Sequence, residues 1–532
     1  MNLLDLLAIP RRETPDRAGL IFRPAGRAAV ELSYRELLDS AERLAAALAR
    51  MGLHAGDRVA LHLDSRPELL LAYLATLRLG AVGVPVHAAY TRPEIAHLLA
   101  DAEPRLLLAE PARRGLLDEL SPDERRSVER VLWADEIAEL AADPAADPAA
   151  GPAPGELPPG PDSGDLALLL YTSGTTGRSK GAMLTHDNLL ATITGLLAAW
   201  AWRREDVLLL ALPLFHTHGL VVGALTALAA GATVVLHPRF DAGAVAAALL
   251  GEADPPRPSL FFGVPTMYVR LVDELARRRA AGEGDLRERL DPGDGGPRLF
   301  ASGSAPLAPE TFAAFRDLTG HEPLERYGMT ETGMLTSNPY AGPRLPGTVG
   351  RPLPGVSLRV VDAGGDEVAD GAEGEVVVRG ANVTEGYWRA PEKTAEAFLT
   401  GPGGRRWFRT GDLGRRDPAT GALTLLGRRH ELVITGGYNV YPREVEEALA
   451  AHPGVREAAV AGVPDRDRGE VPEAWWVAAP GAPPPADDEL ADWCRARLAP
   501  YKVPRRFHRL AELPRNALGK VETRRLPAPA EG

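Results

Sequence analysis

A glycine- and hydroxyl-rich stretch, YTSGTTGRSKGAMLTH at residues 171–186, contains the residue types that bind phosphate groups. Its glycines let backbone N–H groups approach a ligand closely, its serines and threonines add hydrogen-bond donors, and Lys180 adds a positive charge. No Ser or Thr follows a Gly-Lys pair, so the stretch does not match the phosphate loop of kinases and GTPases. A solvent-exposed loop of the same composition, without a ligand, is the alternative interpretation.

Four further motifs follow in the chain: ASGSAPL at 301–307, ERYGMTETG at 325–333, RTGDLG at 409–414 and PRNALGK at 514–520. Together with the first stretch, and in the same order, they resemble the motifs of the adenylate-forming enzymes, a family of acyl-CoA synthetases, luciferases and adenylation domains. The resemblance covers essentially the whole chain. It favours phosphate binding over a ligand-free loop, and it implies that the protein activates a carboxylic acid with ATP.

The resemblance assigns many of these residues to the nucleotide. It implies that Tyr327 packs on the adenine, that Thr330 contacts the nucleotide and that Asp412 binds the ribose hydroxyls. Arg428 is implied to contact the ribose or a phosphate, whereas the alternative is a surface ion pair between Asp412 and Arg428. The nucleotide-binding residues implied in this way are Thr172, Ser173, Gly174, Thr175, Thr176, Gly177, Lys180, Gly303, Ser304, Ala305, Tyr327, Gly328, Thr330, Asp412 and Arg428.

The resemblance also implies a magnesium ion and a catalytic set. Glu331 matches the glutamate that approaches the Mg²⁺ bound to ATP, a cation that takes oxygen ligands and keeps several waters. Lys520 matches a lysine that swings into the site and neutralises charge while a carboxylate attacks the α-phosphate. Thr176 and His216 complete this set. Without the resemblance, Glu331 and Lys520 would be interpreted as solvated charges.

The acceptor of the acyl group is predicted to be coenzyme A. Residues 434–446, ITGGYNVYPREVE, resemble the loop that CoA synthetases rotate toward the site for thioester formation, with Gly436 and Gly437 as the floor of the pantetheine tunnel. This resemblance favours CoA over luciferase-type oxidation. The hinge departs from the family pattern, because His430 stands where Lys or Asp is usual and Glu431 where Asp is usual. A pH-sensitive rotation is one conceivable consequence.

Three segments bear on the acid: LPLFHTHGL at 212–220, FFGVPTMY at 261–268 and the stretch 325–342. Together they are most similar to malonyl-CoA synthetases, which favours malonate or methylmalonate. The resemblance places Thr217 and Met329 at a small acyl pocket beside His216 and His218, and it makes Arg239 the partner of a second carboxylate, with Arg298 less favoured. Aryl or short-, medium- and long-chain fatty acids are the alternatives within the family, and a non-catalytic adenylate-binding protein is the alternative outside it.

Composition limits the partners and the location. The net charge of −12 disfavours nucleic acid as a partner. Cys494 is the only cysteine, so neither an intrachain disulfide nor a Cys-rich metal site is possible. The first residues match no secretory signal or transit peptide, which predicts a cytoplasmic protein. Residues 207–238 lack Asp, Glu, Lys and Arg, but Pro213 and Gly219 interrupt them, so we predict two buried strands and a helix and no transmembrane segment. The oligomeric state is left open.

The elements that must position these residues alternate between strand and helix. Ser33 and Glu36 form a capping box ahead of an apolar-periodic helix. Strands are predicted at 58–63, 81–86 and 166–170, with a helix at 67–79. The alternation predicts an α/β fold with a largely parallel sheet.

A chain of 532 residues exceeds one core, so several structural units are expected. We predict a large multilayer N-terminal domain at 1–427, with two sheets flanked by helices and a small β-barrel-like subdomain at 346–427. A small mobile α+β lid domain is predicted at 428–532. The Pro-rich stretch 141–165 is predicted to be an exposed linker.

Overall fold

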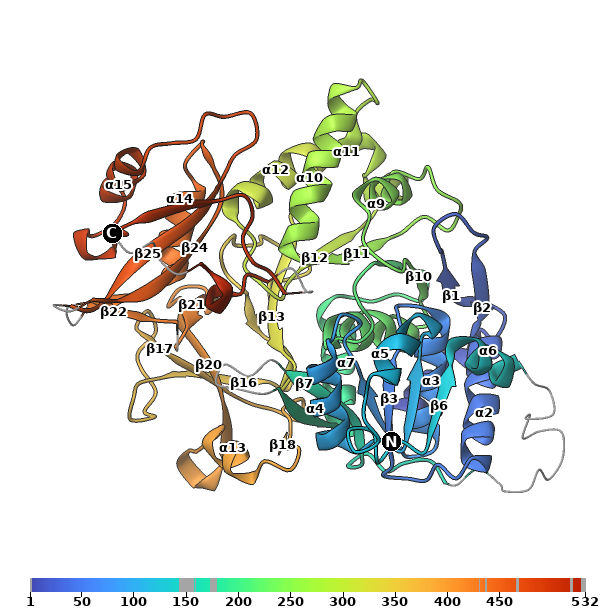
Figure 1. Cartoon of the computed structure of the whole chain (residues 1–532). Helices are drawn as coiled ribbons and strands as arrows, with labels where there is room; N and C mark the ends of the chain where they lie inside the picture. Colours follow the sequence, from blue (N-terminus) through green and yellow to red (C-terminus); the bar gives the residue numbers. More distant parts are fainter. Residues whose placement is uncertain are drawn as a thin grey trace.

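The computed structural model of the chain describes residues 2–142, 157, 159–172, 179–429, 431–435, 438–465, 468–516 and 520–527, and not the side chain of Pro402. Several predicted features lie outside these ranges. They are most of the linker at 141–165, the phosphate-loop residues Ser173, Gly174, Thr175, Thr176 and Gly177, the hinge residue His430, and the tunnel residues Gly436 and Gly437. Figure 1 shows the arrangement of the described elements.

One sheet carries the strand that leads into the predicted phosphate loop. Its described strands lie in the order β18-β8-β7-β4-β3-β5-β6, parallel from β7 through β6 and antiparallel at β8 and β18. The predicted strands at 58–63, 81–86 and 166–170 are β3, β4 and β7 of this sheet. The bounds are β3 (Arg58–His62), β4 (Val82–Pro85), β5 (Leu106–Ala109), β6 (Arg130–Trp133), β7 (Leu166–Thr172), β8 (Lys180–Thr185) and β18 (Gly386–Tyr387).

A second sheet carries the other motifs. Within the described ranges its order is β15-β14-β13-β12-β11-β9-β10-β1-β2, parallel from β13 to β1. The strands are β1 (Ala18–Phe22), β2 (Val30–Ser33), β9 (Val207–Leu210), β10 (Thr233–Leu236), β11 (Leu260–Gly263), β12 (Leu299–Ser302), β13 (Leu324–Met329), β14 (Gly333–Ser337) and β15 (Arg351–Pro352).

Helices pack between and around these two sheets, as the right half of Figure 1 shows. One apolar core joins α2, α3 and α7 to strands of both sheets, and a second core joins α9, α10 and α12 to the opposite face of the second sheet. The predicted capping box is present, since Ser33 and Glu36 cap α2. The helices are α1 (Leu3–Glu13), α2 (Tyr34–Arg50), α3 (Pro67–Arg78), α4 (Arg92–Ala102), α5 (Arg114–Asp118), α6 (Ala134–Ala142), α7 (His186–Ala199), α8 (Thr226–Ala229), α9 (Ala242–Leu249), α10 (Pro265–Ala280), α11 (Leu286–Arg289) and α12 (Pro309–Thr319).

The uncharged stretch 207–238 folds as two buried strands, β9 and β10, joined by helical turns. The first turns, His218–Leu225, are π-helical and continue into α8. Gly219 permits this geometry, because a Cβ there would lie 2.2 Å from the carbonyl oxygen of Pro213. In the described part of the chain, no helix is long and apolar enough to cross a membrane.

The last third of the chain forms two smaller sheets, seen at the left of Figure 1. An antiparallel β-rich unit follows the second sheet, and an α+β unit follows β21. The division at residue 427 stays a prediction, and it lies within the last strand of the β-rich unit. The elements are β16 (Ser357–Val361), β17 (Glu373–Arg379), α13 (Pro391–Glu396), β19 (Phe398–Thr400), β20 (Arg406–Arg416) and β21 (Leu423–Arg428), then β22 (Val433–Thr435), β23 (Tyr438–Val440), α14 (Pro442–Ala450), β24 (Val455–Asp465), β25 (Gly469–Ala478), α15 (Asp487–Arg495) and β26 (Phe507–Leu510).

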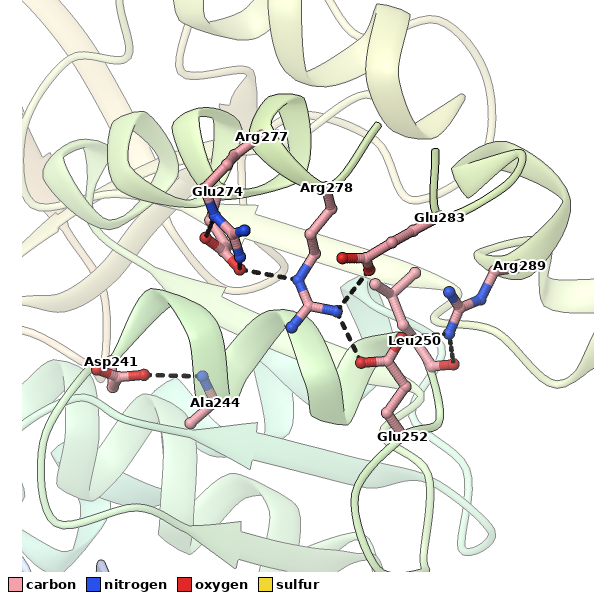
Figure 2. Close-up of polar contacts among 9 residues, drawn as sticks. All are labelled: Asp241, Ala244, Leu250, Glu252, Glu274, Arg277, Arg278, Glu283 and Arg289. Carbon is pink, nitrogen blue, oxygen red and sulfur yellow. Dashed lines mark hydrogen bonds and ion pairs between the residues drawn. The ribbon is translucent and has the colours of Figure 1, made fainter. Parts of the chain in front are cut away.

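A cluster of ion pairs joins α10 to the segments that follow α9 and α10 (Figure 2). The Arg278 guanidinium lies 2.8 Å from the Glu274 carboxylate, 2.7 Å from Glu252 and 3.1 Å from Glu283. Its side chain is only 12% exposed, so water screens these pairs less than ordinary surface pairs. Hydrogen bonds from Arg277 and Arg278 lower the pKa of Glu274 to about 2. The cluster therefore fixes the end of α10 against its neighbours.

We expect Arg278→Met to destabilise the protein, because three carboxylates would lose their shared cation. The expected loss is about 1–3 kcal/mol, a fall of a few degrees in the melting temperature measured by differential scanning fluorimetry. Arg277→Met is the matched control: Arg277 pairs with the same Glu274 but is 64% exposed, so its loss should lower the melting temperature clearly less than the loss of Arg278. Equal shifts for the two variants would contradict this interpretation.

Candidate active site

A cavity of about 970 Å³ lies where the ends of both large sheets meet the β-rich and C-terminal units. Its walls come from many separate parts of the chain, and the motifs named above supply many of its polar groups. The described site residues predicted from the sequence that line it are Thr172, Lys180, His216, Thr217, His218, Ser304, Gly328, Met329, Thr330, Glu331, Arg428 and Lys520. The fold thus collects residues that are up to 350 positions apart in sequence around one space.

An ion pair with a buried carboxylate borders the cavity: Arg428 lines it, whereas Asp412 lies behind Arg428 and does not. Asp412 on β20 faces Arg428 on β21 across the sheet, with 2.7 Å between the Asp412 Oδ1 and Arg428 Nε atoms. The Tyr327 hydroxyl, from β13, donates a hydrogen bond to the same carboxylate. Asp412 is 6% exposed, so this is not the surface ion pair of the alternative interpretation. Gly303 and Ala305 lie in the turn after β12, and Ser304, between them, has a positive φ of 73°.

Glu331 is a buried carboxylate on the cavity wall. It is 6% exposed, and burial raises its pKa, while a hydrogen bond from the Tyr387 hydroxyl, 3.0 Å away, opposes that shift. Among the described residues, no three His, Cys, Asp or Glu side chains form a group that could hold a metal ion. A single carboxylate facing a cavity fits Mg²⁺ that is carried mainly by nucleotide phosphates. Tyr387 did not figure in the sequence interpretation.

Lys520 enters the cavity from the C-terminal unit. It lines the same space as Glu331 and Arg428, and its side chain remains accessible to water there. Two hydrogen bonds hold its backbone to Asn516: the Lys520 N–H donates to the Asn516 side chain at 3.0 Å, and the Asn516 N–H donates to the Lys520 carbonyl at 2.9 Å. The surrounding protein, and then the charge of Arg428, lower the pKa of Lys520. Lys520 thus lines the same cavity as motif residues of the large sheets, and its catalytic role stays a prediction.

The other end of the cavity holds a cation that the sequence interpretation missed. Arg326 on β13 is 5% exposed, and its Nε and Nη2 atoms have no hydrogen-bond partner. Burial lowers its pKa to about 10, so it stays charged at neutral pH. The glycine at position 303 makes room for it, since a Cβ there would lie 2.4 Å from the Arg326 Cζ atom. A charged residue inside an otherwise buried strand was the available signal.

The structure corrects the expectation for Arg239. This residue lies between β10 and α9 in an exposed position and does not line the cavity. Arg298, the less favoured second cation, does not line the cavity either. Its guanidinium forms an ion pair with Asp206 at 2.5 Å. Of the three arginines, only Arg326 belongs to the cavity wall.

Neutral polar groups accompany Arg326. Burial lowers the pKa of His216 to about 3, and burial together with the Arg326 charge places the pKa of His218 well below its ordinary value. Both imidazoles are therefore neutral. The Nδ1 atom of His218 lies 3.2 Å from the Ser304 hydroxyl, while Nε2 of both histidines and the Thr217 hydroxyl have no partner. These groups can receive or donate hydrogen bonds to a ligand that reaches Arg326.

The cavity thus brings together Glu331, a carboxylate that could hold a metal, Lys520 from the C-terminal unit, and Arg326 with its neutral polar neighbours. This arrangement fits a nucleotide-dependent ligase. Two family models match the chain: AMP-binding enzyme over residues 9–388 and AMP-binding enzyme C-terminal domain over residues 444–520. The chain belongs to the AMP-binding enzyme family. It is an ATP-dependent, AMP-forming acyl-CoA ligase, as predicted.

Relatives within the family differ in their acids. The malonate–CoA ligase ACSF3, mitochondrial, of Mus musculus is 36% identical over 93% of this chain and 86% of its own length. A long-chain-fatty-acid–CoA ligase of Bacillus subtilis is 32% identical over 99% of this chain and 94% of its own length. The crystal structure of ATP-bound MatB from Rhodopseudomonas palustris superposes with a TM-score of 0.84 at 40% identity, covering 98% of both chains. The resemblance to malonyl-CoA synthetases and the α/β fold class are thereby confirmed.

We expect Lys520→Ala to lower acyl-AMP formation at least about 100-fold, because one preorganised charge near the attacked phosphate is lost. Acid-dependent pyrophosphate release measures this step. Thioester formation from synthetic acyl-AMP should change little, since no phosphate is attacked there. Lys502→Ala is a control in the same unit, because Lys502 pairs with Glu444 and does not line the cavity. Equal loss in both half-reactions of Lys520→Ala would show a purely structural role.

Proposed function

We propose that the protein is a magnesium-dependent acid–CoA ligase whose substrate is malonate or methylmalonate. The observation that carries this proposal is Arg326, a buried guanidinium with unpartnered donors on the cavity wall. A buried charge without a partner is unfavourable, and a carboxylate supplies both the opposite charge and paired hydrogen bonds. A dicarboxylic acid can place one carboxylate there and offer the other to ATP.

The neutral histidines support a single negative charge at this end. His216 and His218 add no positive charge, so one guanidinium matches one distal carboxylate. Thr217 and Met329 also line the cavity and would limit the room beside the substrate. A long aliphatic acid would leave Arg326 desolvated and unpaired, and this disfavours the fatty-acid alternative.

The reaction would proceed in two steps. An oxygen of the proximal carboxylate attacks the α-phosphorus of ATP, which forms acyl-AMP and breaks the bond to pyrophosphate. Lys520 and Lys180, which line the cavity, would offset negative charge in this step, and Glu331 would hold Mg²⁺, which would screen the phosphates. The CoA thiolate then attacks the acyl carbon and releases AMP. The tunnel for CoA is assigned from the sequence, because Gly436 and Gly437 lie outside the described residues.

The nucleotide contacts and the location remain proposals as well. Tyr327, Asp412 and Arg428 would bind the adenosine, with the turn Gly303–Ser304–Ala305 beside the base. A cytoplasmic location stays a prediction, since several relatives are named mitochondrial.

We expect Arg326→Leu to lower kcat/KM for malonate by roughly thirtyfold to several thousandfold. Truncating one member of a buried charge pair costs on the order of 2–5 kcal/mol. Activity on propionate, which has no second carboxylate, should stay level or rise. CoA-dependent AMP formation with malonate, methylmalonate, propionate and octanoate measures the effect.

Arg239→Leu is the matched control, because Arg239 is exposed and outside the cavity. It should leave the malonate activity within about twofold of wild type. If Arg239→Leu rather than Arg326→Leu abolished malonate selectivity, the assignment of the distal carboxylate would be wrong. Absence of pyrophosphate release with any acid would favour the non-catalytic adenylate-binding alternative.

A further inference from the structure

Tyr387 joins two oppositely charged groups of the cavity. It lies on β18, a two-residue strand that pairs with β8 through Tyr387 and Ala182. The Lys180 ammonium stands over its ring, 5.3 Å from the ring centroid, and its hydroxyl donates to the Glu331 Oε1 atom at 3.0 Å. All three side chains line the cavity.

The backbone around Tyr387 is firmly held. Its N–H donates to the Thr394 hydroxyl at 2.9 Å, and the next residue, Trp388, donates its N–H to the Gly181 carbonyl at 2.8 Å. The Thr384 N–H donates to the Glu331 carbonyl at 2.7 Å, which ties the same segment to the motif that carries the carboxylate. The phenol ring therefore projects from a fixed point between two motifs that are distant in sequence.

Within the described part of the chain, Lys180 and Glu331 form no ion pair with each other, although both face the cavity. A lysine stem is flexible, and attraction between opposite charges is strong in a partly desolvated site. The ring face offers the ammonium a favourable position, and the hydroxyl satisfies the carboxylate. In this arrangement each charge has Tyr387 as a partner in place of the other charge.

We propose that Tyr387 is a positioning residue that keeps Lys180 available for nucleotide phosphates and Glu331 available for the accompanying divalent cation. The proposal rests on the proposed function, which assigns Lys180 to phosphate and Glu331 to Mg²⁺. It adds that the separation of the two charges is maintained by one aromatic side chain. Tyr387 touches neither reacting group and acts through its two neighbours.

The two functions of the side chain can be separated by substitution. Tyr387→Phe keeps the ring under Lys180 and removes only the hydroxyl, whereas Tyr387→Leu removes both. Isothermal titration calorimetry with the full-length protein would measure ATP binding in excess EDTA and then across a Mg²⁺ series. For Tyr387→Phe we expect unchanged metal-free ATP binding. The Mg²⁺ concentration that gives half of the full change in ATP affinity should rise threefold to tenfold.

For Tyr387→Leu we expect metal-free ATP binding to weaken as well, by about threefold to tenfold, because Lys180 can then pair with Glu331. In a Glu331→Gln background the same Leu substitution should cost little in metal-free binding, since no carboxylate remains for Lys180. Tyr34→Phe is the control for loss of a buried tyrosine hydroxyl outside the cavity; that hydroxyl bonds to the Leu228 carbonyl at 3.1 Å.

The outcomes separate the proposal from the function on which it rests. A wild-type protein that binds no ATP with or without Mg²⁺ would overturn both. Wild-type binding with an unchanged Mg²⁺ dependence in Tyr387→Phe would overturn the positioning role alone. Equal weakening of metal-free and Mg²⁺-dependent binding in Tyr387→Phe would show a packing role and overturn the proposal too. The proposal would be supported if Tyr387→Phe changed only the Mg²⁺ dependence while Tyr387→Leu also weakened metal-free binding, and if this weakening disappeared in the Glu331→Gln background.

Discussion

The ion pair between Asp412 and Arg428 is the contact on which the geometry of the site depends. Asp412 belongs to the β-rich sheet, Tyr327 reaches it from the nine-stranded sheet, and Arg428 is the last residue of β21 before the C-terminal unit. One buried carboxylate thus links three parts of the chain. Because an unpaired carboxylate at 6% exposure would be unfavourable, the three parts must meet for it to be satisfied.

A second contact places the C-terminal unit relative to this ion pair. Helix α14 packs on β21, and the Arg443 guanidinium donates to the Leu425 carbonyl at 2.7 Å while it pairs with Glu447 at 2.7 Å. These contacts hold the unit in the orientation in which Lys520 faces Glu331 across the cavity. Arg443 donates to a backbone carbonyl, and carbonyls recur along every strand. The C-terminal unit is therefore held on β21 by a contact to the backbone rather than by a second buried ion pair.

Local patterns predicted the scaffold well. The strands at 207–212 and 233–236 were found because apolar runs bounded by turns leave few alternatives, and α2 was found from its capping box. The π-helical turns after Thr217 were not predicted, because they depend on the close approach of Gly219 to Pro213 in space. Site residues within contiguous sequence motifs were predicted, whereas those outside such motifs were misplaced or missed. Arg239 was misplaced because a position just after a strand does not tell which way the side chain turns, and Tyr387 was missed because its partners lie on two other motifs.

The cavity wall around Arg326 shows why sequence position alone could not identify this arginine as a cation of the site. Arg326 precedes Tyr327 in β13, where the residues around it are buried. From the sequence alone, an arginine inside a buried strand indicates either a salt bridge or a wrong strand prediction. What makes it available to a ligand is the combination of a glycine at 303 and two imidazoles kept neutral by burial. Each of these conditions comes from a different strand end or loop. Arg326 lines the cavity and its neighbour Tyr327 does not, because adjacent residues of a strand point to opposite faces; Tyr327 instead reaches Asp412 on the β-rich sheet.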